Sequence, residues 1–257
     1  MMNDIGPHIP GRGNRSASIM LVGEAGGYKE EELRKCWVGK AGKELARYLR
    51  QAGIDIRDCW LTNLLKHRPT TRSKSGNVKP TAADIRRDEW ELIDELETIR
   101  PTFVGAVGAV ASKWLLGRDV FDSLESMHAF PYQTKNRRAG DAGHEFVTVP
   151  LYHPASGLHS PEQQPVVFFD FLTFGKYVAG KLPLVTPHDT HPDPDYYEPR
   201  ASVRLVPNLP IAIDTEGLLE AGRGVWGLSF TQFAGSAGVV RATNKRALRS
   251  MKEQLFR

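Results

Sequence analysis

Four short apolar runs, separated by segments of helical spacing, limit the folds open to this chain more than any other feature. The runs are residues 18–22, 58–65, 102–107 and 146–149. Helical spacing or strong apolarity predicts helices at 45–52, 82–99, 109–116 and 165–179, the second opened by a capping-box pattern at Thr81–Asp84. Strands that alternate with helices pair mainly in parallel and are covered on both faces. We therefore predict an α/β domain with three layers, α/β/α, and a four-stranded, mainly parallel sheet.

Composition changes beyond the last of these helices and divides the chain into three parts. Residues 186–207 begin with a stretch rich in Pro and Asp and are expected to form a linker between a first domain, 1–185, and a shorter segment, 208–257. In that segment, apolar runs followed by a basic amphipathic stretch predict a three-stranded β-meander and a helix, at 211–216, 225–230, 238–242 and 244–256.

Composition excludes several classes of protein. The 257 residues, 40% hydrophobic and 25% charged, are typical of a globular chain, and two cysteines are too few for a disulfide framework. No apolar run approaches the roughly 20 residues of a membrane span, and the first 16 residues lack the apolar core of a secretory signal. We expect a cytoplasmic protein with no membrane partner. A net charge of +4 favours a polyanionic partner.

Polar motifs follow three of the predicted strands. Gly23–Gly27, with Glu30 and the WVGKAG stretch at 37–42, follows the first strand; TNLLKHRP at 62–69 ends the second; and HPASGL at 153–158 follows the fourth. Because the carboxyl ends of parallel strands lie at one edge of a sheet, these motifs are expected to meet there.

In this order, the motifs resemble those of the uracil-DNA glycosylase superfamily, particularly its thermophile-type family four and the related cross-linking family. Members typically read G-E-x-P-G-x-x-E-D, P-F-V-G-x-A-G, T-N-x-x-K-C-R-P and H-P-S or H-P-A. The resemblance covers about residues 19–179. It implies an enzyme that flips uracil out of DNA and hydrolyses its N-glycosidic bond, leaving an abasic site for base excision repair. The implied partner is uracil-containing DNA.

The resemblance and the chemistry of the reaction together assign roles to the motif residues. The bond breaks with positive charge on the sugar and negative charge on the departing base, so a carboxylate, Glu24, and an imidazole, His153, are the catalytic candidates. The amide of Asn63 would pair with the edge of uracil, and Trp37 would stack on the flipped ring where the family usually has Phe. Ala25 and Glu30 complete the predicted uracil-binding set, with Glu30 at the position that shapes the pocket against a thymine methyl group.

Each of these residues also has an ordinary structural interpretation. Glu24 could cap the following helix, His153 could be a loop histidine bonded to backbone, Asn63 could close a turn, and Trp37 could be a core or lid aromatic. Their joint occurrence in the order of one family favours the functional interpretation.

A basic loop supports DNA as the partner. Its cations, from Lys66 to Lys79, occur with no acidic residue among them, and Lys135, Arg137 and Arg138 form a second cluster. Leu158 is the predicted wedge that fills the gap left by the flipped base. The complete predicted DNA-binding set is Gly39, Lys40, Gly42, Lys66, His67, Arg68, Arg72, Ser156 and Leu158.

The chain departs from the family pattern in its cysteines. Family four usually carries four cysteines that bind an iron–sulfur cluster, whereas this chain has only Cys36 and Cys59, and His67 stands at the expected motif cysteine. We therefore expect no cluster and no other cofactor, so packing must replace the structural role of the cluster. Gly26 replaces the usual Pro. The stretch 69–83 contains no His, so a covalent DNA adduct of the cross-linking type is not expected.

The last segment has a resemblance of its own. Asp214 and Glu216, two apart on a predicted strand, resemble the first metal-binding motif of DnaQ-like 3′–5′ exonucleases, a ribonuclease-H-like fold. The other acidic motifs of that family do not follow, so this incomplete Mg²⁺ pair predicts no exonuclease activity. The combination suggests a replication polymerase, fused or associated, as in a bacterial or phage-infected cell. Two alternatives stay open: a uracil- or single-stranded-DNA-binding module without turnover, and a nuclease fragment.

Overall fold

A computed structural model describes the fold for residues 6–69, 78–136, 140, 143–182, 184, 212–216, 227–233 and 236–241. The chain divides by its contacts into two units, Met1–Lys181 and Leu182–Arg257, and each is described by itself.

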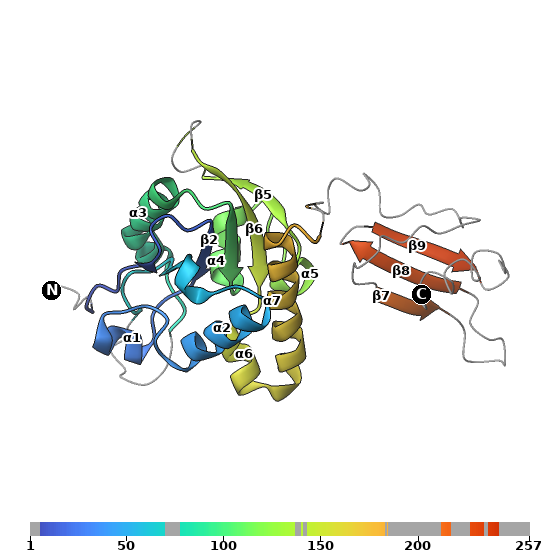
Figure 1. The fold of residues 1–257 in the computed structure, drawn as a ribbon, viewed down its shortest axis with the longest axis horizontal. Coiled ribbons are helices and arrows are strands. Elements are labelled where there is room, and N and C mark those ends of the chain that lie inside the picture. Colours follow the sequence, from blue (N-terminus) through green and yellow to red (C-terminus); the bar gives the residue numbers. More distant parts are fainter. Residues whose placement is uncertain are drawn as a thin grey trace. The chain divides into compact units, whose positions relative to one another are not determined.

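One six-stranded sheet forms the centre of the first unit (Figure 1). In spatial order its strands are β1 (Arg12–Gly13), β3 (Cys59–Asn63), β2 (Ile19–Gly23), β4 (Phe103–Val107), β6 (Glu145–Leu151) and β5 (Tyr132–Lys135). The four inner strands are parallel and are the four that the apolar runs predict, whereas β1 and β5 pair antiparallel at the two edges. The predicted fold class is confirmed, but the predicted count of four strands is too low. The edge strands escape prediction because one has two residues and the other is largely polar.

Four of the helices of this unit occur where spacing, apolarity and caps predict them, and three short helices were not predicted. Their bounds are α1 Tyr28–Leu33, α2 Lys40–Gln51, α3 Ala82–Ile99, α4 Ala109–Leu116, α5 Leu124–Met127, α6 Pro154–His159 and α7 Gln164–Val178, with 3₁₀ turns at Ile56–Asp58 and Pro161–Gln163. The capping box is confirmed, since Thr81 Oγ1 accepts from the Asp84 N–H at 3.2 Å and the Thr81 N–H donates to Asp84 Oδ2 at 2.9 Å. The three unpredicted helices are α1, α5 and α6, and α6 begins within an expected loop. Its first residue is proline, which fits the first turn of a helix because that N–H needs no partner.

Helices cover both faces of the sheet, as predicted. On one face, Met20 and Val22 of β2 belong to an apolar cluster with Leu92 and Leu96 of α3 and Leu115 of α4. On the opposite face, a methyl group on Gly105 would lie 2.6 Å from Leu21 Cδ1, 3.0 Å from Leu151 Cδ1 and 3.5 Å from the Phe174 ring. Helices α2 and α7 contact each other there, with the Tyr48 and Phe171 rings stacked at 5.5 Å. Alternate residues of each strand therefore face the two helical layers.

Strand register brings the three motif loops to one edge. Gly23, the last residue of β2, pairs with Asn63, the last residue of β3, and Val107 pairs with Leu151 at the same end of β4 and β6. The pairing continues beyond the strands, because the Leu65 N–H donates to the Glu24 carbonyl oxygen at 3.0 Å.

The second unit contains a smaller antiparallel sheet, in the order β7 (Ala212–Glu216), β8 (Gly227–Phe233) and β9 (Ser236–Arg241). These strands occur where the three apolar runs predict a meander. The predicted linker at 186–207 and the predicted helix at 244–256 lie outside the described residues.

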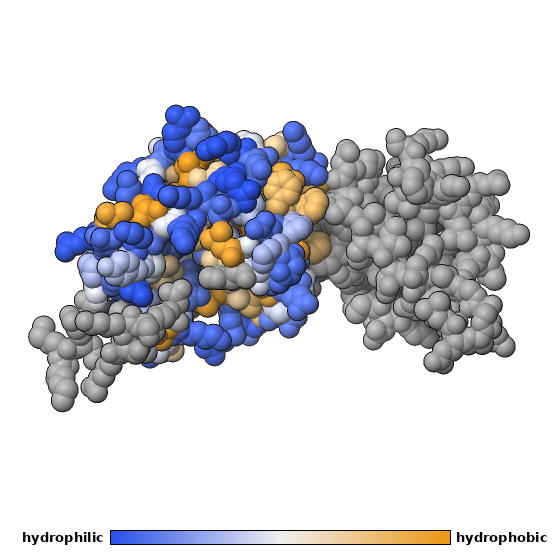
Figure 2. All heavy atoms as spheres, turned by 90° about the horizontal axis from the view of Figure 1, so that it is seen from below, coloured by the Kyte–Doolittle hydropathy of each residue, from blue (hydrophilic) through white to orange (hydrophobic). Residues whose placement is uncertain are grey.

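Polar residues predominate on the face of the first unit that Figure 2 shows. Figure 2 shows hydrophilic residues over most of one face, with apolar residues gathered in small separate patches. Among the described residues, no helix combines the length and the apolar character that a membrane crossing requires.

Two phenylalanines of α7 test the assigned packing. Phe174 is fully buried against the sheet and Phe169 is 62% exposed. We predict that Phe174→Ala lowers the free energy of unfolding by about 3–5 kcal/mol, because it leaves a cavity in the core. Phe169→Ala is the matched control and should change it by less than about 0.5 kcal/mol. Urea denaturation measures both, and equal effects would contradict this orientation of α7.

Candidate active site

A cavity of about 470 Å³ opens at the edge where β2, β3 and β6 end, a volume in the range of pockets for small ligands. It is lined by Glu24, Trp37, Asn63 and His153, so the acid, indole, amide and imidazole predicted from separate motifs meet around one space. Six other predicted residues also line it, namely Ala25, Glu30, Gly39, Lys40, Arg68 and Ser156. Sequence reasoning assigned no role to two apolar lining residues. Pro69 ends the second motif, and Val78 lies in the basic loop, where no motif marks it.

Glu24 contributes a carboxylate to the lining of the cavity. It directly follows β2, and no hydrogen bond to its side chain is found within the described part of the chain. Burial raises the pKa of Glu24 above its usual value, and the positive charge of Lys79 partly offsets this. The alternative that Glu24 caps a helix is wrong, because Gly27 is the N-cap residue of α1. The Glu24 carboxylate is therefore available to a ligand in the cavity.

Asn63 lies against a glycine that leaves it room. Its amide is 4% exposed, and a methyl group on Gly23 would overlap Asn63 Oδ1 and lie 2.6 Å from the Trp37 ring. Gly23 is thus required by the close approach of both side chains. Within the described residues the Asn63 amide makes no hydrogen bond, although buried amides nearly always have partners. This leaves a donor and an acceptor for a bound molecule.

Trp37 forms a wall of the cavity and is itself firmly held. Its indole N–H donates to the Thr62 carbonyl oxygen at 3.0 Å, and Arg12 Nη2 donates to the Trp37 carbonyl oxygen at 3.1 Å. The indole stacks on the His153 ring, with centroids 5.6 Å apart and planes 24° apart. The ring is only 6% exposed, so the alternative of a core aromatic accounts for its packing, while stacking on a base remains a prediction.

The buried carboxylate of Glu30 joins the two halves of the first motif. Its Oε1 accepts from the N–H groups of Val38 and Gly39 at 3.0 and 2.7 Å, and its Oε2 accepts from the Gly27 N–H at 3.2 Å. Three backbone donors compensate the buried charge. Glu30 therefore fixes the WVGKAG loop, which carries Trp37, to the start of α1.

His153 is both a helix cap and a wall of the cavity. Its Nδ1 accepts from the Ala155 N–H at 3.1 Å as the N-cap of α6, so the alternative of a histidine bonded to backbone is correct as geometry. Because Nδ1 is an acceptor, the neutral ring carries its proton on Nε2. Burial lowers the pKa of His153 to about 4, against a smaller opposing effect of Glu30. At neutral pH the ring is an uncharged hydrogen-bond donor.

Two residues of the predicted DNA-binding set are inaccessible. Lys66 is fully buried, and its ammonium group donates to Thr62 Oγ1 at 2.6 Å and to Glu95 Oε2 at 2.8 Å. Gly42 is buried against the backbone of Trp37. The prediction that these residues contact DNA is wrong. The basic composition of the loop led us to expect an exposed Lys66. Its partner Glu95 lies on α3, 29 residues further along the chain, so nothing near Lys66 in the sequence indicates its burial.

The other members of the DNA-binding set that the structure describes lie at or near the cavity. Lys40, Arg68 and Ser156 line the opening, and Leu158 on α6 is 43% exposed. Arg68 forms an ion pair with Glu31 at 3.2 Å, while its buried Nε has no partner within the described structure. His67 is mostly buried and bonded to Asp88. Arg72 lies outside the described residues.

The cysteines of this chain do not fit an iron–sulfur cluster. Such clusters need four protein ligands, most often thiolates, and the chain has two cysteines. Cys36 Sγ donates to the Leu61 carbonyl oxygen at 3.1 Å, and burial raises the thiol pKa values of Cys36 and Cys59 to about 11 and about 12. Among the described residues, no three or more His, Cys, Asp or Glu side chains are grouped to hold a metal ion. The side chains of Asp214 and Glu216 are not described.

Comparisons with known proteins agree with the motifs. Residues 10–172 match the model of a family described as the uracil DNA glycosylase superfamily. A type-4 uracil-DNA glycosylase of Archaeoglobus fulgidus is 31% identical over 176 residues, 68% of this chain and 84% of the relative. One of Saccharolobus solfataricus is 32% identical over 174 residues, 67% and 77% of the two chains. A DNA polymerase of Bacillus phage SP01 is 26% identical over 176 residues, 68% of this chain and 17% of the polymerase.

The protonation of His153 is directly measurable. We predict that its ring titrates near pH 4 in the folded protein, because burial disfavours the charged form. NMR of histidine ring carbons across pH 3.5–8 gives the value, and the resonance that disappears in His153→Gln provides the assignment. Titration of that ring at or above its usual pKa of about 6.5 would contradict the buried, capping position.

Proposed function

Because the chain belongs to the uracil DNA glycosylase superfamily, we propose that it hydrolyses the N-glycosidic bond of uracil in DNA and leaves an abasic site. The observation that carries the proposal is the meeting of Glu24, Trp37, Asn63 and His153 around one cavity. A glycosylase must take its target base out of the stack, and such a cavity suits a flipped pyrimidine.

Uracil is held on its edge and on its face. The amide of Asn63 donates to a carbonyl oxygen of uracil and accepts from the neighbouring ring N–H, a pattern that cytosine does not offer. The Trp37 ring stacks on the base, a contact worth about 1–3 kcal/mol per base. Glu30 keeps the Trp37 loop in place, and Ala25 and Glu30 limit the space available for a 5-methyl group.

Bond cleavage separates charge, and two groups respond to that charge. As the bond from C1′ to N1 breaks, its electron pair moves to the uracil ring and positive charge develops on the sugar. The Glu24 carboxylate stabilises that charge and orients the water that attacks C1′. The neutral His153 donates a hydrogen bond from Nε2 to the uracil anion. A hydrogen-bond donor that is already in position where negative charge develops lowers the activation barrier strongly. No step needs a metal cluster.

DNA binding uses the rim of the cavity. Lys40 and Arg68 bring positive charge to the phosphates next to the flipped nucleotide, and Ser156 adds a hydrogen bond. The Gly39 N–H is held by Glu30, so Gly39 contributes only a rim without a side chain, which lets the DNA backbone approach closely. Leu158 enters the stack where the base has left. We assign Arg72 to phosphate contact from its place in the basic loop.

We further propose that the partner of this glycosylase is a replication DNA polymerase, fused or associated, in the cytoplasm of a bacterial or phage-infected cell. The 26% identity to a part of the phage SP01 polymerase supports this proposal. The Asp214 and Glu216 pattern agrees with it, since it resembles the start of a proofreading domain, and residues 208–257 would then be an incomplete exonuclease-like segment after a linker at 186–207.

A uracil excision assay tests the activity. The protein is incubated with a uracil-containing oligonucleotide in EDTA and then treated with alkali, which cuts the strand at abasic sites. We predict scission at uracil, reduced about 10²–10³-fold in Glu24→Gln and in Asn63→Ala, as for loss of one group that stabilises a transition state. Glu32→Gln, which removes an exposed carboxylate on α1, is the matched control and should retain activity.

Other outcomes of this assay favour the alternatives. Tight binding of uracil-containing DNA without scission would indicate a binding module. Magnesium-dependent shortening from the 3′ end would indicate a nuclease.

The pH dependence of kcat tests the role of Glu24. Its carboxylate must be ionised for catalysis, and burial raises its pKa. As pH is lowered, activity should therefore begin to fall at a pH above 4.5, the usual pKa of a glutamate side chain. Lys79 lowers that pKa, and Lys79→Met should therefore move the acid limb to higher pH. Lys113→Met on α4 is the control and should leave the limb unchanged. A shift of the limb to lower pH in Lys79→Met would contradict the assignment.

A further inference from the structure

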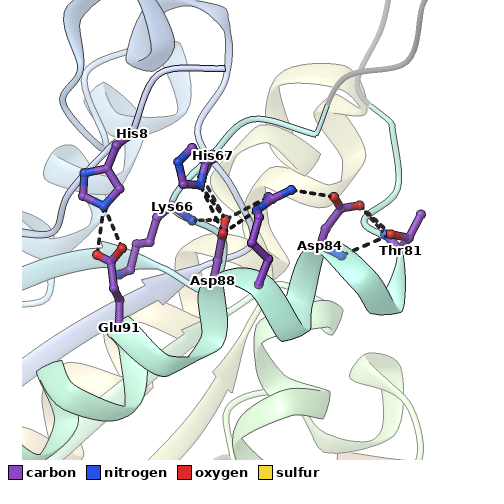
Figure 3. A network of polar contacts seen from close by, with 8 residues as sticks. His8, Lys66, His67, Thr81, Asp84, Asp88 and Glu91 are labelled. Atoms are coloured by element: carbon purple, nitrogen blue, oxygen red, sulfur yellow. Dashed lines mark hydrogen bonds and ion pairs between the residues drawn. The ribbon is translucent and has the colours of Figure 1, made fainter. Parts of the chain in front are cut away.

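A network of polar contacts joins the loop that follows β3 to helix α3 and to the segment that precedes the sheet (Figure 3). Figure 3 shows Asp88 of α3 pointing toward Lys66 and His67 of that loop, with His8 and Glu91 paired beside them. Because residues 66 and 67 lie between Asn63 and Arg68, the network has a direct covalent path to two residues of the cavity.

Asp88 is the centre of the network. Its carboxylate is 2% exposed and accepts from the backbone N–H groups of Lys66 and His67 at 2.8 and 3.0 Å, and from His67 Nδ1 at 3.1 Å. Arg87 adds two charged hydrogen bonds, from Nε at 2.6 Å and from Nη2 at 3.0 Å. A buried carboxylate persists only when it is so compensated, and here two of the donors are the backbone of the loop itself.

Other contacts tie the same loop from its remaining sides. The ammonium group of Lys66 donates to Glu95, which lies about two turns beyond Asp88 on α3. The Ile9 N–H donates to the Lys66 carbonyl oxygen at 2.7 Å, and His8 bonds Glu91 at 2.8 Å. The segment that precedes the sheet, the loop and α3 are therefore held to one another by polar contacts.

His67 occupies a position that has a different role in the family that the chain resembles. In family four the corresponding residue is usually a cysteine that binds an iron–sulfur cluster, and the cysteines of this chain do not fit such a cluster. We propose that Asp88 is a positioning residue that, with His67 and Arg87, anchors the loop between Asn63 and Arg68 in place of such a cluster and thereby sets the uracil-binding amide. The proposal rests on the proposed function for what the amide binds.

The charge of Asp88 is maintained by its neighbours. Burial by itself raises the pKa of Asp88, but hydrogen bonds and charge from Arg87 and His67 outweigh it, so the pKa lies below its usual value. The other ionisable groups nearby belong to Asp84, Glu91 and Glu95 on the same helix and to His8 and Lys66 from other segments. A lowered pKa means that the anchor is complete above the unfolded-state pKa of about 3.9 and is lost only as pH falls through the folded-state value.

Asp88→Asn tests the anchor with little change in shape. We expect kcat/KM on uracil-containing DNA to fall roughly tenfold or more, because small misplacement of a binding group is costly. In the background of Asn63→Ala, the same substitution should have little further effect, since the group that it positions is absent. Asp94→Asn, at an exposed position on the same helix, is the matched control and should retain full activity. Circular dichroism verifies that each variant is folded at the assay temperature.

A second readout does not depend on activity. We expect Asp88→Asn to shift the side-chain amide resonance of Asn63 and to accelerate hydrogen exchange at the Lys66 and His67 amides, with no such changes in Asp94→Asn. If Asp88→Asn does not fold, His67→Gln is measured in the same ways.

The outcomes separate the two claims. A wild-type protein inactive on uracil-containing DNA would overturn the proposed function, and the Asn63 resonance would still judge the anchor. An active wild type with Asp88→Asn indistinguishable from Asp94→Asn, or with effects of Asp88→Asn and Asn63→Ala that simply multiply, would overturn the positioning role.

Discussion

The parallel pairing of β2 with β3, in register from Ile19 and Cys59 to Gly23 and Asn63, is the constraint on which the site depends. It sets the ends of the two strands side by side, so that the residue after one strand, Glu24, and the last residue of the other share an edge. Gly23 is the point of closest approach, since any larger residue there would collide with the Asn63 amide and the Trp37 ring. A slip of one residue would turn Asn63 to the other face of the sheet.

Buried charge supports this edge from behind. Glu30, Asp88 and Asp170 are all nearly inaccessible, and each accepts backbone N–H groups of a loop that carries cavity residues. Asp170 on α7, for example, accepts from the Tyr152 N–H at 2.7 Å, one residue before His153, and its other oxygen bonds His128 at 2.6 Å. Carboxylates that bind loop backbone in this way give precise geometry to irregular segments, which an apolar core alone would hold loosely.

Local signals account for the part of the structure that was predicted from sequence. Helix α4 matches its prediction residue for residue, and the Thr81 cap marks the start of α3, because spacing and capping act within a few residues. Long-range partners are not encoded locally. The basic loop predicted Lys66 on the surface, yet Glu95 draws it into the interior, and nothing near Asp88 in the sequence indicates that it binds residues 21 and 22 positions earlier. The site residues were predicted because they belong to motifs that follow strand ends and resemble those of one family, whereas the residues that support them belong to no such motif.

The most direct test of the central claim is a crystal structure of Glu24→Gln bound to uracil-containing DNA. The account predicts uracil extruded into the cavity, its ring stacked on Trp37 and its edge within hydrogen-bond distance of the Asn63 amide, with His153 Nε2 next to a uracil oxygen. A uracil that remains in the base stack, or that binds away from these four side chains, would contradict it.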